Sequence, residues 1–264
     1  MDLQLKNKTA FITGSTAGIG YATARTLANE GASIILNGRT AESVAKAVQK
    51  FQEEFPNSTV SGFATDFSKS NEVEELLSKL PEIDILINNV GIYSSGSFFK
   101  TADEDWYCQF EINVMSGVRL SKRILPKMLS KDWGRILFVS SECATLVPVD
   151  MIPYSMTKAA LHAVSRGLAQ LTKSSGVTVN TIVPGSTLSE GAERFLENAA
   201  EKEGKTKAEV EEAFFTEVRT SSLLQRFAKV EEVANTITYL CSPLSAATNG
   251  SAIKVEGGST GGIL

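Results

Sequence analysis

A tyrosine and a lysine, Tyr154 and Lys158, stand four residues apart in the segment Tyr-Ser-Met-Thr-Lys. On a helix this spacing puts both side chains on one face, so a phenol and an ammonium can share one site. A phenol is a poor acid–base group near neutral pH, but a nearby ammonium favours the phenolate and lowers the pKa of the phenol. The pair is a candidate for proton transfer, although such pairs are common on helices and the spacing alone does not decide.

A glycine-rich turn follows the first apolar run of the chain, between an expected strand and an expected helix. This context is the one that a phosphate-binding turn requires. Gly14 permits a tight turn, Gly18 lets the backbone approach a pyrophosphate, and Gly20 lets the helix pack closely on the sheet. We expect the site to be built from Gly14, Ser15, Gly18, Ile19 and Gly20, with free backbone donors at Ser15 and Ile19. The alternative is a purely structural glycine turn.

Two residues after later strands bear on which dinucleotide would bind. Asn37-Gly38-Arg39-Thr40 contains no acidic residue to accept from a ribose 2′-hydroxyl, whereas Arg39 can pair with a 2′-phosphate. This favours NADP(H), with NAD(H) as the alternative. Asp66 ends the third expected strand, where its carboxylate can accept from an adenine amino group or cap the next helix; both interpretations are equally supported.

The elements that must position these residues alternate along the chain. The expected strands are Thr9–Thr13, Ser33–Leu36, Val60–Ala64, Ile83–Ile87, Arg135–Val139, Val177–Val183 and Ala252–Val255. The expected helices are Ile19–Glu30, Thr40–Phe55, Asn71–Leu80, Asp103–Leu129, Ser155–Ser174 and Val230–Ser242. This order predicts an α/β fold, namely one Rossmann-type, doubly wound domain whose parallel sheet has helices on both faces.

The remaining composition bounds the function. A chain of 264 residues without a linker or repeat predicts a single domain over 1–264, with a charged helical insertion at about 189–226. A net charge of −4 argues against a nucleic-acid partner, and three scattered cysteines with a single histidine argue against a metal site or disulfides. We expect no membrane span and a cytoplasmic location, because no long apolar run is present.

Taken together, these motifs resemble the classical short-chain dehydrogenase/reductase family over nearly the whole chain. The turn Thr13-Gly14-(x)3-Gly18-Ile19-Gly20, the segment Asn88-Asn89-Val90-Gly91 and the pair Tyr154-(x)3-Lys158 look like three motifs of that family. Asn113, Ser141 and Pro184-Gly185 also fall where the family would have them. The general plan is similar to that of bacterial 3-oxoacyl-acyl-carrier-protein reductases.

The resemblance implies a catalytic tetrad of Asn113, Ser141, Tyr154 and Lys158. Tyr154 would exchange the proton, Ser141 would hydrogen-bond the substrate oxygen, and Lys158 would also hold the nicotinamide ribose. Asn113 would support a water-linked relay through Lys158. Ser141 is preferred over Ser140 because its separation from Tyr154 matches the family. The further implied cofactor contacts are Asn89, Gly91, Pro184, Gly185 and Thr187.

The sequence departs from the family pattern at three places. Val90 replaces an alanine, Ala144 stands where a glycine often follows the serine, and Thr187-Leu188-Ser189 shifts the hydroxyl after Pro-Gly, so that Thr187 or Ser189 could contact the cofactor. We prefer Thr187. The candidate pocket residues are Glu142, Cys143, Val147, Met151, Leu188 and Phe195.

These observations predict an oxidoreductase that transfers hydride between NADP(H) and a small carbonyl or secondary alcohol substrate, with ketone reduction as the leading reaction. The alternatives are an NAD-dependent alcohol dehydrogenase and a non-catalytic dinucleotide-sensing protein. The resemblance also implies a homotetramer or homodimer, with the Asp103–Leu129 and Ser155–Ser174 helices as an intersubunit bundle.

Overall fold

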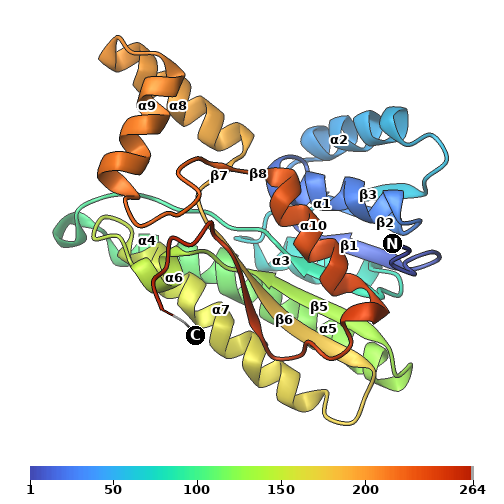
Figure 1. The fold of residues 1–264 in the computed structure, drawn as a ribbon. Coiled ribbons are helices and arrows are strands. Elements are labelled where there is room, and N and C mark those ends of the chain that lie inside the picture. Colours follow the sequence, from blue (N-terminus) through green and yellow to red (C-terminus); the bar gives the residue numbers. More distant parts are fainter. Residues whose placement is uncertain (263–264) are drawn as a thin grey trace.

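The central sheet contains seven strands in the order β3-β2-β1-β4-β5-β6-β9, all parallel. The computed structural model describes residues 1–262 (Figure 1). The strands are β1 (Thr9–Ile12), β2 (Ser33–Gly38), β3 (Val60–Ala64), β4 (Ile85–Asn88), β5 (Gly134–Val139), β6 (Val177–Pro184) and β9 (Ala252–Val255). The strands β1, β4, β5 and β6 are almost continuously buried, as parallel strands covered on two faces must be.

Helices cover both faces of the sheet, as the sequence predicts. The helices are α1 (Gly18–Asn29), α2 (Ala41–Glu54), α3 (Ser70–Lys79), α4 (Asp103–Phe110), α5 (Ser116–Ser130), the short α6 (Cys143–Leu146), α7 (Ile152–Leu171) and α10 (Val230–Cys241). One core layer joins the sheet to α1, α2 and α10. The other joins it to α3, α5 and α7. The predicted doubly wound α/β fold is therefore confirmed.

The chain reverses its direction of travel across the sheet between β1 and β4. From β1 it builds outward through β2 and β3, and it then returns to place β4 on the other side of β1. Ala10 of β1 is thus in register with Ile34 on one side and Ile85 on the other. In open sheets of this kind, ligands bind beyond the carboxyl ends of the strands at such a reversal. The glycine turn after β1 and the Asn-Asn segment of β4 both lie at this point.

The expected helix Asp103–Leu129 is not a single regular helix. A π-helical turn, Glu111–Met115, separates α4 from α5, and the Ser116 N–H bonds to the carbonyl of Glu111, five residues earlier. The chain stays helical throughout, so the periodic pattern of the sequence is preserved, but one turn is wider than the rest. The turn carries Asn113.

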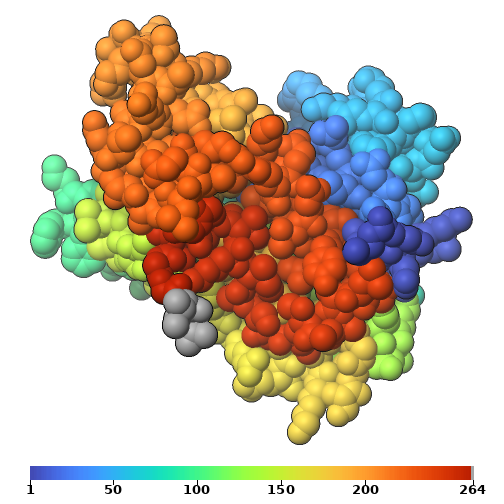
Figure 2. All heavy atoms as spheres, viewed as in Figure 1, coloured from blue at the N-terminus to red at the C-terminus, as the bar shows by residue number. Residues whose placement is uncertain are grey.

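The predicted insertion forms a helical arm. It comprises α8 (Glu190–Glu203), α9 (Lys207–Ala213) and a π-helical turn at Phe214–Val218, and we call residues 190–218 the arm. The arm has a small apolar core separate from the two core layers of the sheet, made of its residues Leu196, Ala200, Val210 and Phe215 together with Phe227, which follows it. Two short strands, β7 (Thr187–Leu188) and β8 (Ala228–Lys229), pair at its base. Figure 2 shows the arm standing apart from the lobe that contains α2, with a notch between them.

No helix within residues 1–262 combines the length and the apolar character needed to cross a membrane.

Candidate active site

The glycine turn has the geometry of a close-packed turn at the start of α1. Gly14 and Gly18 have φ angles of +60° and +58°, a region that side chains other than glycine rarely adopt. A Cβ on Gly20 would lie 2.6 Å from the carbonyl oxygen of Gly14 and 2.7 Å from Asn89 Nδ2. Gly20 therefore permits the close approach of α1 to the turn that a pyrophosphate site needs.

The turn is held in place by polar side chains rather than left free. The Gly14 N–H donates to Asn37 Oδ1 at 3.0 Å, and the Ser15 N–H donates to the carbonyl of Asn37 at 2.8 Å. The free donor expected at Ser15 is therefore wrong in this structure, because β2 already uses it. Asn89 Nδ2 donates to the carbonyls of Thr13 and Gly14, each at 2.9 Å. Asn89 thus braces the turn from β4.

One backbone donor of the turn faces an anion. The Gly18 N–H donates to Oε2 of Glu190, the first residue of α8, at 2.8 Å. Ala17, at the N-cap of α1, provides no side-chain cap, and the first turn of α1 contains no acidic residue. The positive end of the α1 dipole is thus available to a negative group from outside the helix. This donor set fits a dinucleotide pyrophosphate.

Arg39 and Asp66 lie near one another beyond the ends of β2 and β3. Arg39 is exposed, and its positive charge contributes to lowering the pKa of Asp66. The larger cause of that lowering is the Ser68 hydroxyl, which donates to Asp66 Oδ1 at 2.7 Å. Because α3 begins only at Ser70, Asp66 closes a turn and is not the N-cap of that helix, which removes one of its two sequence interpretations.

Tyr154 and Lys158 project from the first two turns of α7, which begins at Ile152 and has Pro153 near its start. Lys158 is buried, with Nζ 5.5 Å from the centre of the Tyr154 ring. Its ammonium donates to the carbonyl of Val139, at the end of β5, at 2.8 Å. The helix begins three residues earlier than expected, because Pro153 suits a first turn and both partners then lie well inside the helix.

The electrostatics of this pair differ from the sequence expectation. Burial raises the pKa of Tyr154 above its usual value, while the nearby Ser141 hydroxyl works in the opposite direction. Burial also lowers the pKa of Lys158 to about 8. The expected lowering of the Tyr154 pKa by the ammonium is therefore wrong here, because loss of hydration is the largest influence on the phenol and Lys158 is not among the groups that shift its pKa. The phenol keeps its proton at neutral pH.

Asn113 reaches the site from the π-helical turn. Its Oδ1 accepts from the Ile92 N–H at 2.7 Å, and its Nδ2 donates to the Ile92 carbonyl at 2.9 Å and to Thr157 Oγ1 at 3.0 Å. A Cβ built on Gly91 would lie 3.2 Å from Lys158 Nζ and 3.6 Å from Asn113 Oδ1. The structure thus brings Asn113, Gly91 and Lys158 together, and the absence of a side chain at Gly91 leaves room for the ammonium.

The two serines after β5 point in different directions. Ser140 is buried, donates to the carbonyl of Lys158 at 2.8 Å and pairs with His162 Nε2 at 2.9 Å, so α7 occupies its hydroxyl. Ser141 is partly exposed; its hydroxyl accepts from the Cys143 N–H at 3.2 Å and lies near the Tyr154 phenol. Of the two, only Ser141 has a hydroxyl on the side of the phenol.

A buried ion pair lies directly behind Ser141. Glu142 Oε1 accepts from Arg219 Nε at 2.8 Å and from Ser186 Oγ at 3.1 Å. The side chains of Glu142 and Arg219 are only 3% and 15% exposed. Arg219 follows the arm and lies 77 residues from Glu142, and no local pattern in the sequence signals the contact. The pair ties the arm to the loop that carries the serine.

The residues after β6 have mostly structural partners. A Cβ on Gly185 would lie 2.7 Å from the Cα of Glu256, so this glycine permits β6 and the segment after β9 to approach. Thr187 Oγ1 donates to the Gly185 carbonyl at 2.9 Å, and Ser189 Oγ caps α8 through the Ala192 N–H. Both candidate hydroxyls are thus used within the loop. Pro184 ends β6 and is buried.

The candidate pocket residues divide into two groups. Cys143 is buried, Met151 is partly exposed, and Leu188 packs against the core of the arm. Val147 and Phe195 are about half exposed, and Val147 has φ +45°, an unusual angle for a β-branched residue. Sequence reasoning missed Tyr93, whose ring meets that of Tyr154 edge to face at a centroid distance of 5.9 Å.

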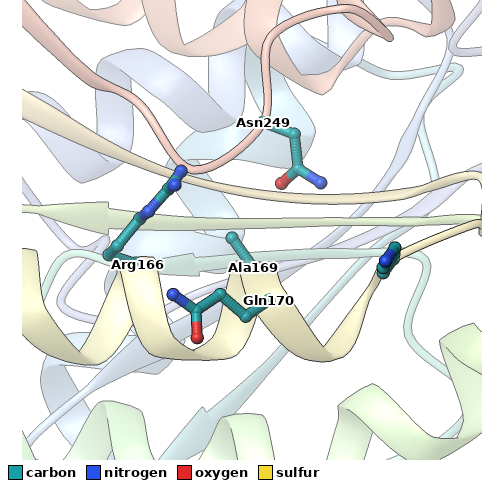
Figure 3. A pocket seen from close by; sticks show the side chains of 5 residues that line it. Arg166, Ala169, Gln170 and Asn249 are labelled. Carbon is teal, nitrogen blue, oxygen red and sulfur yellow. The ribbon is translucent and has the colours of Figure 1, made fainter.

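The described residues also form a surface cavity of about 290 Å³ on the far part of α7, lined by Arg166, Ala169, Gln170, Lys173 and Asn249 (Figure 3). Arg166, Ala169 and Gln170 lie at the opposite end of α7 from Tyr154, Lys173 follows the helix and Asn249 precedes β9, so this cavity is separate from the candidate active site. A second cavity of about 220 Å³ lies beside Pro153 and is lined mainly by the polar residues of segment 94–101.

The motif order of this site has a direct counterpart among known proteins. The family model for short chain dehydrogenase matches residues 8–200, which include the glycine turn, the Asn-Asn segment, Ser141 and the Tyr154/Lys158 pair. The chain belongs to the short-chain dehydrogenase/reductase family. The resemblance inferred from the sequence is confirmed, and the protein is an oxidoreductase of the kind that acts on CH–OH or C=O groups.

Relatives in this family align over nearly the whole chain. The oxidoreductase YvrD of Bacillus subtilis (strain 168) is 46% identical over 261 residues, which is 98% of each chain. The 3-oxoacyl-[acyl-carrier-protein] reductase FabG of Escherichia coli (strain K12) is 30% identical over 260 residues, 97% of this chain and 98% of its own. The crystal structure of L-sorbose reductase from Gluconobacter frateurii, complexed with NADPH and L-sorbose, aligns over 100% of both chains with a TM-score of 0.92 and 32% identity.

Proposed function

We propose that this short-chain dehydrogenase/reductase reduces a ketone to a secondary alcohol with NADPH as the hydride donor. The observation that carries the proposal is the protonated, partly buried phenol of Tyr154 beside Ser141, with Lys158 and Asn113 gathered around Gly91. The raised pKa keeps the phenol protonated in the unliganded protein, and an alkoxide that develops on a neighbouring oxygen is a strong enough base to take that proton. Such a group suits reduction.

Each residue of the site has a defined part in this proposal. The Ser141 hydroxyl donates to the substrate oxygen and steadies the charge that develops there, while Tyr154 delivers the proton to the same atom. A nicotinamide bound at this site would supply the hydride that reduces the carbonyl carbon. Lys158 holds the nicotinamide ribose. Asn113, whose side chain is fixed by Ile92 and Thr157, supports a water-linked relay through Lys158 that returns a proton to Tyr154.

The cofactor is held by the glycine turn and the ends of β2 and β3. The Gly18 N–H and the dipole of α1 take the pyrophosphate, and the exposed guanidinium of Arg39 pairs with the 2′-phosphate of NADPH. Support comes from the structural relative that was crystallised with NADPH. The segment Asn37–Thr40 provides no carboxylate to select a ribose 2′-hydroxyl.

Replacement of Tyr154 by phenylalanine tests the reaction. The Tyr154→Phe variant should lose at least about a hundredfold in kcat/KM for ketone reduction, because the proton donor is gone, while its Kd for NADPH stays within about twofold. Tyr107→Phe is the matched control, since Tyr107 is 73% exposed on α4. A Tyr154→Phe enzyme with unchanged turnover would refute the assigned acid.

Titration with both dinucleotides tests the cofactor preference. Wild-type protein should bind NADPH more tightly than NADH, and Arg39→Gln should weaken NADPH binding by about tenfold or more while leaving NADH nearly unaffected. NADH serves as the internal control, because it lacks the 2′-phosphate. Tighter binding of NADH by the wild type would instead favour the NAD-dependent dehydrogenase.

A further inference from the structure

The contact between Glu190 and the glycine turn joins two segments that are 172 residues apart. Glu190 opens α8, where Ser189 caps the helix through the Ala192 N–H, so the carboxylate extends from the root of the arm toward α1. The contact is exposed, and Oε2 lies 2.8 Å from the Gly18 nitrogen. A Cβ on Gly18 would lie 3.5 Å from Ser189 Cβ, so the segment itself rests against the turn.

This carboxylate stands where the cofactor's anionic group should be. A carboxylate and a phosphate oxygen are both negatively charged acceptors, and a helix N-terminus attracts either one. They cannot use the same N–H together, and at contact distance they repel each other. The Gly18 N–H therefore has two competing partners, one supplied by the protein and one by the dinucleotide.

We propose that Glu190 is a self-inhibitory latch, which holds the arm on the glycine turn and must be displaced by the dinucleotide pyrophosphate. The inference rests on the proposed function, because it requires a dinucleotide at this turn. It goes further because it assigns a role to the arm: the position of the start of α8 depends on whether the cofactor site is filled.

The two ends of the arm are fastened with different strength. Within residues 1–262, the side chain of its first residue makes one hydrogen bond to the body, the exposed Glu190–Gly18 contact. At its far end the buried Arg219–Glu142 pair is reinforced by the Leu223 and Leu224 N–H groups, which donate to the Gly257 carbonyl at 2.8 Å and 3.0 Å. Because α8 and α9 share one apolar core, displacement of Glu190 moves the near end of a cohesive unit that stays anchored at the other.

Dinucleotide affinity tests the latch directly. Glu190→Gln should tighten the Kd of NADPH by about three- to tenfold, because the neutral amide competes less well for the Gly18 N–H and does not repel the pyrophosphate. Adenosine 2′-monophosphate, which has no pyrophosphate, should bind the variant and the wild type equally. Both Kd values are measured by fluorescence titration of the purified full-length chain, without turnover.

Glu193→Gln is the matched control. Glu193 is an exposed glutamate in the same first turn of α8, so its replacement changes the net charge by the same amount and leaves Glu190 in place. Its Kd for NADPH should stay within about 1.5-fold of the wild type, since an exposed charge away from the contact is largely screened. Tightening confined to Glu190→Gln and to the ligand that has a pyrophosphate supports the latch.

Three results would overturn it: an unchanged Kd for NADPH in Glu190→Gln, equal tightening in Glu193→Gln, or equal tightening for adenosine 2′-monophosphate. The second and third results would show that the tighter binding comes from the change in net charge and not from the loss of the Glu190–Gly18 contact. If the wild type bound neither NADPH nor NADH, the proposed function would fall as well. If the wild type bound NADPH tightly and Glu190→Gln had the same Kd, the latch hypothesis alone would be refuted.

Discussion

Removal of Arg219 should destabilise the protein more than removal of its partner Glu142. The Glu142 side chain is 3% exposed, and its carboxylate depends on Arg219 and Ser186, while its Oε2 has no hydrogen-bond partner within the described chain. In Arg219→Gln a buried negative charge loses its counter-charge, which costs about 3–5 kcal/mol. For a chain of this length, that corresponds to a fall in Tm of about 10 °C.

The reciprocal change should be milder. Arg219 is 15% exposed, so its guanidinium can keep contact with water, and in Glu142→Gln the amide oxygen can still accept from Nε. We expect a cost of about 1–3 kcal/mol. The double variant, Glu142→Gln with Arg219→Gln, contains no buried charge at this position and should be more stable than Arg219→Gln alone.

Denaturant unfolding of the wild type and the three variants measures this order. Midpoints and slopes from fluorescence or circular dichroism give the free energies, and the double-variant cycle gives the coupling between the two side chains. The reasoning is refuted if Arg219→Gln costs less than about 1 kcal/mol, or if the second substitution makes Arg219→Gln less stable rather than rescuing it.

Two further predictions concern the site itself. Burial lowers the pKa of Lys158 to about 8, below its unfolded value, so the cost of the buried charge is fully present below pH 8 and is relieved as the pH rises toward about 10. Lys158→Met should therefore raise the free energy of unfolding by about 1–3 kcal/mol at pH 7 and by less at pH 9, measured by denaturant titration at both values; an equal gain at both would contradict it. Gly20→Ala should lower Tm and weaken dinucleotide binding, because the new Cβ would lie 2.6 Å from the Gly14 carbonyl oxygen. Gly167→Ala, in the interior of α7, is the control, because its new Cβ would meet no atom within 4 Å beyond the neighbouring backbone of its own helix. This variant should gain about 1 kcal/mol in free energy of unfolding; thermal unfolding compares the two variants, and equal effects would count against the steric argument.

The positions of the strands follow closely from the sequence, because short runs rich in β-branched and apolar residues stand out between polar turns and helical segments. Val60–Ala64 and Ala252–Val255 have the predicted bounds, and β1 differs from its prediction only in ending at Ile12 instead of Thr13. The glycine turn was recognisable for the same reason, since only glycine tolerates the angles and the packing found there. Local chemistry determines these features, so a linear pattern reveals them.

Features that depend on distant parts of the chain did not follow. Ser15 was expected to offer a free N–H, but pairing with Asn37 is decided by how β2 lies against the turn. The pKa of Tyr154 was expected to fall because of Lys158, whereas burial, which a spacing of four residues does not specify, raises it. The partner of Glu142 follows the arm, 77 residues away, and the partner of Gly18 is the first residue of the arm, 172 residues away.

The π-helical turn at Glu111–Met115 changes how this region tolerates insertions and deletions. Such a turn contains one residue more than a regular turn, and one residue corresponds to about 100° of rotation around the axis. Deletion of a single residue there would restore uniform pitch without breaking the helix, but would turn α4 relative to α5 and take the Asn113 amide out of phase with Lys158. Loss of one codon in this part of the gene would therefore leave the segment helical but would move Asn113 out of its place in the active site.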